Sequence, residues 1–149
     1  MAKIIVYNNS TDRMETYYRG ESQSMPYNTN GTLLVKEFRG ASNSSTLWTT
    51  KNTMLSWNSQ RYLFGAPIPV GYAFRRPWEG RSYRSKPTFC WNAFDVGQGW
   101  TNAKRATLRT SARNSGLWNY IEPVSYHQLG YILIEDNRHQ LVQQVDILK

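Results

Sequence analysis

The sequence predicts a single α+β domain in which helices flank a small antiparallel sheet. The 149 residues are 40% hydrophobic and 14% aromatic, which is enough to bury one core and too apolar for a disordered chain. Short segments rich in β-branched and aromatic residues alternate with two longer segments that begin at a threonine and end at a glycine. No repeat, linker or low-complexity tract divides residues 1–149, so one domain is expected to span the chain.

The first part of the chain predicts three strands. Residues 3–7 are apolar and β-branched, and residues 14–18 form a candidate short strand within a polar segment. Residues 32–38 alternate well enough between apolar and polar side chains to predict another strand. Residues 39–45 are rich in Gly, Ser and Asn, which predicts a loop.

The next segment predicts a helix. Thr49 or Thr50 can cap its N-terminus, the helix should run to about Phe64, and Gly65 should end it. Apolar residues seven positions apart lie on one face of a helix. Two such rows are therefore expected to face the core, Leu55 with Tyr62 and Trp57 with Phe64.

A second helix is predicted later in the chain. Thr101 can cap its N-terminus, the helix should run to about Ser115, and Gly116 is the expected stop. The side chains available for packing are those of Ala103, Ala106, Leu108 and Ala112. Four further strands are expected at residues 70–74, 89–96, 118–121 and 131–135, with a long basic loop at 75–88 and helical spacing in the tail at 141–148.

Positive charge is concentrated in one stretch of the chain. The formal net charge is +8, and residues 75–113 hold nine Lys or Arg residues against two acidic residues. Aromatic residues are interleaved with these cations, a pattern that binds phosphates and stacks on bases, or binds anionic cell-wall polymers and carboxylates. A solvated basic face is the simpler interpretation. No recognised nucleic-acid-binding motif accompanies the charge, so nucleic acid is an alternative partner.

The composition excludes several classes of protein. A single cysteine, Cys90, excludes an intramolecular disulfide framework and any zinc site built from several thiolates. The two histidines, His127 and His139, leave little material for metal chemistry or for a Ser–His–acid triad. No apolar window is long enough to span a bilayer, and no signal peptide is recognisable. We therefore expect a cytoplasmic protein, or a phage-associated protein released by lysis.

Three acidic residues are the candidate catalytic groups. Asp95 stands within an otherwise apolar predicted strand, and burying a carboxylate is costly unless it is paired or bound to a metal. Asp95 is therefore expected to meet an arginine, backbone amides or an ion. Glu122 and Glu135 flank strand-like segments and could act as a general base or as ion-pair partners.

Four segments together resemble a known family. They are residues 38–50 (FRGASNSSTLWTT), 69–80 (PVGYAFRRPWEG), 93–98 (AFDVGQ) and 115–123 (SGLWNYIEP). The chain resembles the zinc D-alanyl-D-alanine carboxypeptidases and their phage or clostridial endopeptidase relatives, cell-wall hydrolases that share a fold with the hedgehog signalling domain. The resemblance covers roughly residues 1–136, while the tail at 137–149 diverges. It implies a hedgehog/DD-peptidase-like fold and a peptidoglycan substrate.

The zinc motif of that family is mostly missing here. The family pattern is S-x-H-x-x-G-x-A-x-D, followed later by a His in a Val-His-x-Asp strand; two His and one Asp hold the zinc, and a carboxylate activates its water. Of the first motif, Ala93 and Asp95 match, whereas Lys86, Thr88 and Trp91 stand at the Ser, His and Gly positions. In the second motif Leu133 replaces the His and Glu135 replaces the Asp, if about one residue is inserted before it.

A substitute zinc site would have to use Cys90, Asp95 and His127. Cys90 and Asp95 are five residues apart, so in a regular strand they point to opposite faces and a bulge would be required. The alternative hypothesis is therefore an active zinc D,D-peptidase with replaced ligands, in which Asp95, Glu122 and Glu135 would be catalytic.

The leading hypothesis is a non-catalytic relative that binds an anionic ligand and needs no cofactor. The ligand would be a peptidoglycan peptide, an anionic wall polymer or an acidic protein surface. The expected ligand-binding residues are Arg75, Arg76, Trp78, Arg81, Arg84, Lys86, Trp91, Asp95 and Trp100. Binding of nucleic acid is the second alternative.

Overall fold

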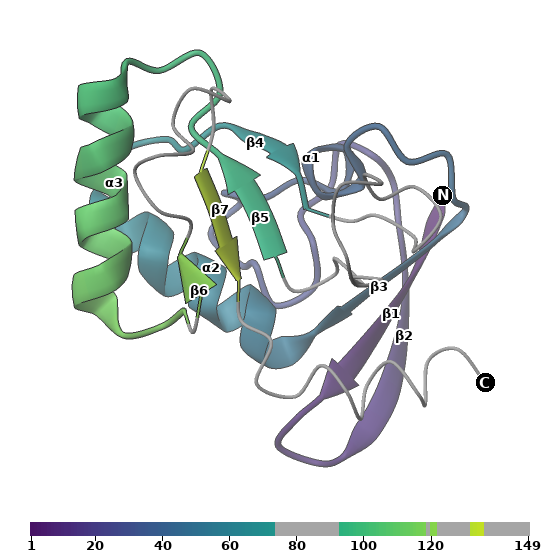
Figure 1. Ribbon diagram of the computed structural model, residues 1–149. Helices are drawn as coiled ribbons and strands as arrows, with labels where there is room; N and C mark the ends of the chain where they lie inside the picture. Colours follow the sequence, from purple (N-terminus) through teal and green to yellow (C-terminus); the bar gives the residue numbers. More distant parts are fainter. Residues whose placement is uncertain (74–92, 119, 122–131, 136–149) are drawn as a thin grey trace, which may run out of the picture.

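Two small sheets and two long helices form the described part of the protein (Figure 1). The computed structural model describes residues 1–73, 93–118, 120–121 and 132–135. The predicted α+β class is confirmed within these residues. The strands belong to two separate sheets, however, and one of them includes a parallel pair, so the expectation of a single antiparallel sheet was wrong.

The first sheet has three strands in the order β2-β1-β3. β1 (Ala2–Asn8) pairs antiparallel with β2 (Arg13–Arg19), and both confirm predicted strands. β1 also pairs in parallel with β3 (Thr46–Thr50), a strand that the sequence did not predict. Successive strand residues alternate between faces, and the buried residues of β1 lie on the face toward the core.

The second sheet has four strands in the order β4-β5-β7-β6, and all its described pairs are antiparallel. Its strands are β4 (Val70–Tyr72), β5 (Ala93–Val96), β6 (Tyr120–Ile121) and β7 (Ile132–Glu135). All four lie within segments predicted as strands. The predicted residues 74 and 89–92, the basic loop that begins at residue 75 and the predicted tail helix lie outside the described residues.

Both long helices have the caps that the sequence predicts. In α2 (Lys51–Phe64) the Thr50 hydroxyl accepts a hydrogen bond from the backbone N–H of Thr53 at 3.0 Å, and Gly65 ends the helix in a left-handed conformation. In α3 (Asn102–Ser115) Thr101 accepts from the N–H of Lys104 at 3.2 Å, and Gly116 ends the helix in the same way.

Residues 32–38 do not form the predicted strand. They lead instead into a short helix, α1 (Val35–Arg39). The Glu37 carboxylate accepts a hydrogen bond from the backbone N–H of Leu34 at 2.9 Å, which stabilises the first turn. Val35 and Phe38, three residues apart, are then buried on one face of this turn.

Two predictions about helix packing were wrong. On α2 the row of Trp57 and Phe64 faces inward, but Leu55 is 41% exposed and Tyr62 is 80% exposed. On α3, Leu108 and Ala112 are buried as expected, but Ala103 is exposed. The remaining space beside α3 is filled by the side chain of Arg105, which is buried.

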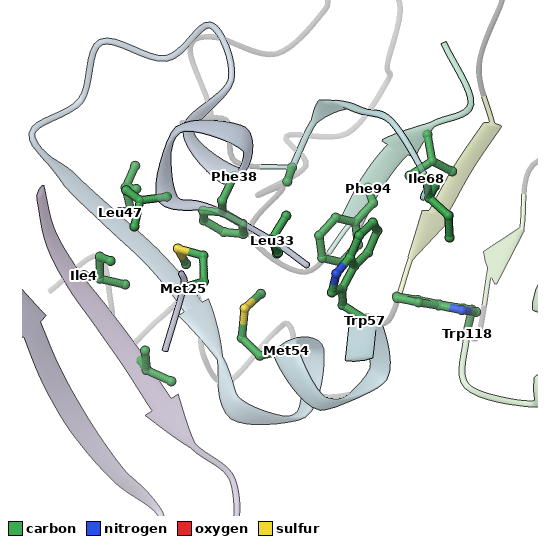
Figure 2. Close-up of a cluster of buried hydrophobic side chains, with 14 of the residues drawn as sticks. Ile4, Met25, Leu33, Phe38, Leu47, Met54, Trp57, Ile68, Phe94 and Trp118 are labelled. Carbon is green, nitrogen blue, oxygen red and sulfur yellow. The ribbon is translucent and has the colours of Figure 1, made fainter. Parts of the chain in front are cut away.

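One core joins the two sheets (Figure 2). Trp57 of α2 lies at its centre, and its ring centroid is 4.9 Å from that of Phe94 on β5. Phe94 in turn meets Trp118 edge to face at 5.8 Å. The core side chains drawn in Figure 2 include Ile4, Met25, Leu33, Phe38, Leu47 and Met54 from the first half of the chain.

A buried glutamine connects the two long helices. Gln60 of α2 is fully buried; its amide donates to the Ser111 hydroxyl of α3 at 3.0 Å. Its carbonyl oxygen accepts from the indole N–H of Trp118 at 2.9 Å. Because each polar atom of this amide has a partner, its burial is compensated.

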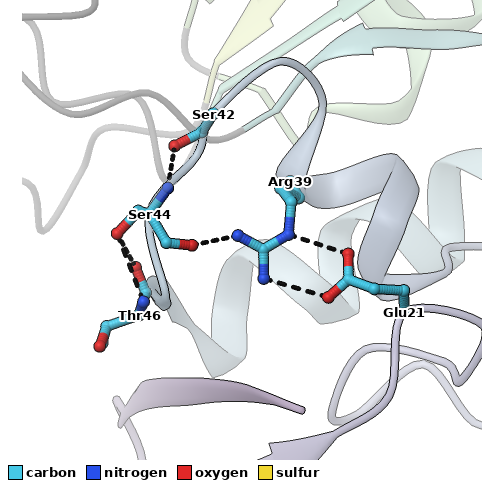
Figure 3. A network of polar contacts seen from close by, with 5 residues as sticks. All are labelled: Glu21, Arg39, Ser42, Ser44 and Thr46. Atoms are coloured by element: carbon cyan, nitrogen blue, oxygen red, sulfur yellow. Dashed lines mark hydrogen bonds and ion pairs between the residues drawn. The ribbon is translucent and has the colours of Figure 1, made fainter.

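The predicted loop at 39–45 is held by an arginine (Figure 3). Arg39 forms a two-point ion pair with Glu21, at 2.8 and 3.1 Å, and also donates to the backbone oxygen of Ser44. The Ser44 hydroxyl donates to the backbone oxygen of Thr46 at 2.6 Å, where β3 begins.

Within the described ranges, no helix is long and apolar enough to cross a membrane.

Candidate ligand-binding site

The structure describes three of the residues that the sequence assigned to a site. Asp95 lies on β5, Trp100 lies between β5 and α3, and Glu135 is the last residue of β7. The other candidates lie outside the described residues: Arg75, Arg76, Trp78, Arg81, Arg84, Lys86, Cys90, Trp91, Glu122 and His127.

Asp95 is buried, as the sequence predicts, with 2% of its surface exposed. β5 is an inner strand of the second sheet, and the register pairs Asp95 with Tyr72 of β4 and with Leu133 of β7. Glu135 pairs with Ala93, two positions along β5 from Asp95. The two candidate acids therefore belong to neighbouring strands of the second sheet, two register positions apart.

The connection after Asp95 is built around a buried arginine. Arg105 donates to the backbone oxygen of Gly97 at 3.2 Å, to that of Trp100 at 2.5 Å and to the Asn102 side chain at 2.6 Å. Gly97 has φ +85°, and a Cβ there would come within 3.0 Å of the Arg105 side chain. Arg105 thus stabilises this turn. It is not part of an exposed basic surface, although it belongs to the basic stretch at residues 75–113.

Gln98 extends this arrangement to β4. Its amide donates to the backbone oxygen of Asp95 at 3.0 Å. The same side chain lies over Gly71, where a Cβ would come within 2.7 Å of the Gln98 amide carbon. A side chain at position 71 would therefore displace Gln98, which explains why glycine stands in this strand.

Trp100 was expected to stack on a ligand, and its ring already has neighbours within the protein. The ring stacks on Phe64 of α2 with centroids 5.5 Å apart and planes 22° apart. The Lys104 ammonium lies 4.5 Å from the centroid of the Trp100 ring, a cation–π contact. Trp100 therefore joins the end of α2 to the start of α3.

A polar cluster on the first sheet was not predicted from the sequence. The Glu15 carboxylate accepts hydrogen bonds from Tyr27 at 2.6 Å, from Asn8 at 2.9 Å and from Tyr17 at 3.0 Å. The bonds from Asn8 and Tyr27 lower the pKa of Glu15, while the bond to Glu15 and burial raise the pKa of Tyr27. Tyr27 has φ +67°, an uncommon conformation for a tyrosine, so the cluster holds a strained residue.

Charge is distributed unevenly between the parts of the chain. Residues 1–37 contain four basic and four acidic residues, a net charge of zero. Residues 38–73 and 93–118 contain seven basic residues and one acidic residue, the buried Asp95. Residues 74–92 add five basic residues against Glu79. The excess positive charge thus lies in the part of the chain that carries Asp95.

The described residues around Asp95 do not fit a catalytic zinc ion. Such a site needs about three protein ligands that converge on the metal. The register places an aliphatic residue, Leu133, directly opposite Asp95. In the part of the chain that the structure describes, no three His, Cys, Asp or Glu residues are grouped closely enough to hold a metal. The chain matches no protein-family model, no curated protein and no solved structure.

Proposed function

We propose that the protein is a non-catalytic relative of the zinc D,D-peptidases that binds an anionic ligand. The two sheets and flanking helices would be a variant of the hedgehog/DD-peptidase fold. The ligand would be a peptidoglycan stem peptide, an anionic wall polymer or an acidic protein surface. It would bind to the basic and aromatic residues between β4 and β5, beside Asp95.

The pairing of Asp95 with Leu133 is the observation that carries this proposal. The resemblance assigns Asp95 to one zinc-ligand position and Leu133 to a second, which a histidine would occupy in the family. These two positions are directly opposite each other on neighbouring strands, where two residues could share a metal. An alkyl side chain cannot coordinate zinc, so this arrangement favours a scaffold that has lost its metal.

The sheet topology supports an anionic ligand at the same place. β4 and β5 pair antiparallel, so residues 73 and 92 are attached to the same end of the second sheet. Glu135, the end of β7, also lies at this end, because it pairs with Ala93. The intervening segment contains Arg81, Arg84 and Lys86, which suit carboxylates and phosphates.

The test combines metal analysis with ligand binding on the full chain. We expect less than stoichiometric zinc, no release of D-alanine from a stem peptide ending in D-Ala-D-Ala, and binding to isolated peptidoglycan that weakens as salt is raised. The variant Arg81→Ser/Arg84→Ser/Lys86→Ser should lose this binding. The matched control Lys3→Ser/Arg13→Ser/Lys36→Ser, which removes the same charge from residues 1–37, should retain it.

Other outcomes would reject the proposal. One zinc per chain together with peptidase activity lost in Asp95→Ala would establish the active enzyme instead. Binding that does not respond to salt would exclude the basic segment as the site. A mobility shift with single- or double-stranded nucleic acid, in the absence of peptidoglycan binding, would favour the nucleic-acid alternative.

A further inference from the structure

A second surface, on α2 and α3, combines exposed apolar side chains with unbalanced positive charge. Leu55 is 41% exposed, Tyr62 is 80% exposed and Leu63 is 56% exposed. Together with the exposed Ser59, these residues occupy positions i, i+4, i+7 and i+8 of α2, so they form one strip along the helix. Single exposed apolar residues are common, but a continuous strip of them indicates an interaction surface.

Neither long helix contains an acidic residue. α2 contains Lys51 and Arg61, and α3 contains Lys104, Arg105, Arg109 and Arg113. Surface helices usually mix charges of both signs, which adds stabilising pairs between residues three or four apart. Arg105 is committed to the turn after β5, which leaves the other five cations with no carboxylate on either helix.

A lysine of α3 lies near the C-terminal end of α2, where the strip ends. Lys104 is exposed, and its ammonium lies over the Trp100 ring, which stacks on Phe64. Tyr62 and Leu63 immediately precede Phe64 in α2. Lys104 therefore lies near the end of α2 at which the strip ends, and the basic excess extends from there along α3.

We propose that the strip of Leu55, Ser59, Tyr62 and Leu63, with Lys104 near the same end of α2, binds an acidic amphipathic helix of a partner protein. Such a helix would complement this surface in both hydrophobicity and charge. Aliphatic and aromatic side chains at helical spacing match the apolar face of another helix, and the cations of two acid-free helices match acidic residues at its margins. A second copy of this chain would bring two acid-free helices together, so charge repulsion disfavours it. Nucleic acid would match the cations but leave Leu55 and Leu63 without suitable contacts.

The test uses a labelled synthetic helix with leucines at every third or fourth position and glutamates elsewhere. Fluorescence anisotropy with the full chain should show saturable binding, and a scrambled peptide of the same composition should bind about tenfold more weakly, the change expected when apolar contacts worth about 1.4 kcal/mol are lost. The variant Tyr62→Ser/Leu63→Ser should weaken binding by at least about tenfold. Because both side chains are exposed, this variant should fold normally.

A pair of charge reversals separates specific contacts from net charge. Lys104→Glu should weaken peptide binding, whereas Lys36→Glu, an equal change at an exposed position of α1, should leave it almost unchanged. Equal binding of the designed and scrambled peptides, or equal effects of the two reversals, would overturn the proposal. So would unchanged binding in Tyr62→Ser/Leu63→Ser. Binding of anionic vesicles or a single-stranded oligonucleotide that depends on Tyr62 and Leu63, without peptide binding, would identify another partner and also overturn it.

Discussion

The two halves of the protein use charged side chains in opposite ways. In residues 1–37 each of the four carboxylates accepts a hydrogen bond or forms an ion pair. Glu15 accepts from Asn8, Tyr17 and Tyr27, and the Tyr7 hydroxyl donates to Asp12. Glu21 pairs with Arg39, and Glu37 accepts from the first turn of α1. These acids hold strands, turns and loops together.

The described residues that follow, 38–73 and 93–118, are organised by neutral groups, by the pairing of Arg39 with Glu21 and by the buried Arg105. Gln60 connects α2, α3 and Trp118, and Arg105 binds backbone oxygens of the turn after β5. Asp95 is the one acid among the residues of this part, and it is buried. The carboxylates of residues 1–37 are thus engaged within the protein, whereas the described residues that follow carry seven basic residues and one acid.

The largest effect is expected from removing Trp57, which contacts residues of both halves of the chain. Trp57 packs on Phe94 of the second sheet, and its indole N–H donates to Thr32 at 3.3 Å. Trp57→Ala should cost about 3–5 kcal/mol, because a large buried side chain is lost and a cavity remains. Urea unfolding followed by circular dichroism measures this loss.

Tyr62→Ala is the matched control on the same helix. Its side chain is 80% exposed, so the change in stability should stay within about 0.5 kcal/mol. If the core is continuous, both sheets of the Trp57→Ala variant should unfold in a single transition. Two separate transitions, one for each sheet, would contradict a shared core.

Local sequence signals predicted most of the elements correctly. The caps at Thr50 and Thr101 and the stops at Gly65 and Gly116 involve residues close in sequence, so the chain itself encodes them. β3 was missed because its place beside β1 is a long-range pairing, and residues 46–50 carry no distinctive periodicity. Residues 32–38 were misassigned because a strand-like alternation concealed the helical spacing of Val35 and Phe38.

The candidate site was predictable only in part. The burial of Asp95 followed from a carboxylate within an apolar strand, and the structure confirms it. The internal role of Arg105 could not be predicted, since in the sequence it is one of several arginines on a basic helix. Gly97 and Gly99 adopt positive φ in the turn after β5, and nothing in the sequence indicates which cation stabilises that turn. The pairing of Asp95 with Leu133 required the register of two strands distant in sequence.

Removing the Glu15 carboxylate should have an effect of intermediate size, and it tests whether the acids of residues 1–37 stabilise the fold. Because its folded-state pKa is lowered, Glu15 contributes stability above its ordinary pKa of 4.5, and this contribution is lost as pH falls below that value. Glu15→Gln should therefore reduce stability at neutral pH and flatten its decline in acid. Thermal unfolding between pH 3 and pH 7 measures both effects. An unchanged acid profile would show that the cluster does not stabilise the fold.

The phenol bond within this cluster can be tested separately. Tyr27→Phe should cost about 1 kcal/mol at neutral pH, the usual net value of one hydrogen bond. Tyr18→Phe is the control, because Tyr18 is 63% exposed and its neighbours on β2 point to the opposite face. Equal losses in the two variants would mean that the bond to Glu15 adds nothing.

The smallest effect is expected from adding an acidic residue to α3, which contains none. Thr110 is exposed on α3, three residues before Arg113, so Thr110→Glu should add a pair worth about 0.2–0.5 kcal/mol. Thr110→Gln introduces a similar side chain without charge, so the stability difference between the two variants isolates the electrostatic part. That difference should disappear at high salt. The same pair of changes at Thr11, beside Asp12 in the balanced half, should show no gain.

A gain at position 110 would show that α3 keeps its positive charge at the expense of stability. A protein selected only for stability would be expected to acquire such easily found surface pairs, and acid-free helices are most simply retained where function needs them. The stabilised Thr110→Glu variant should then bind the acidic helical peptide no more tightly than Thr110→Gln does. If the glutamate gave no stability, the excess charge of the second half would be energetically neutral, and the contrast between the halves would lose its functional meaning.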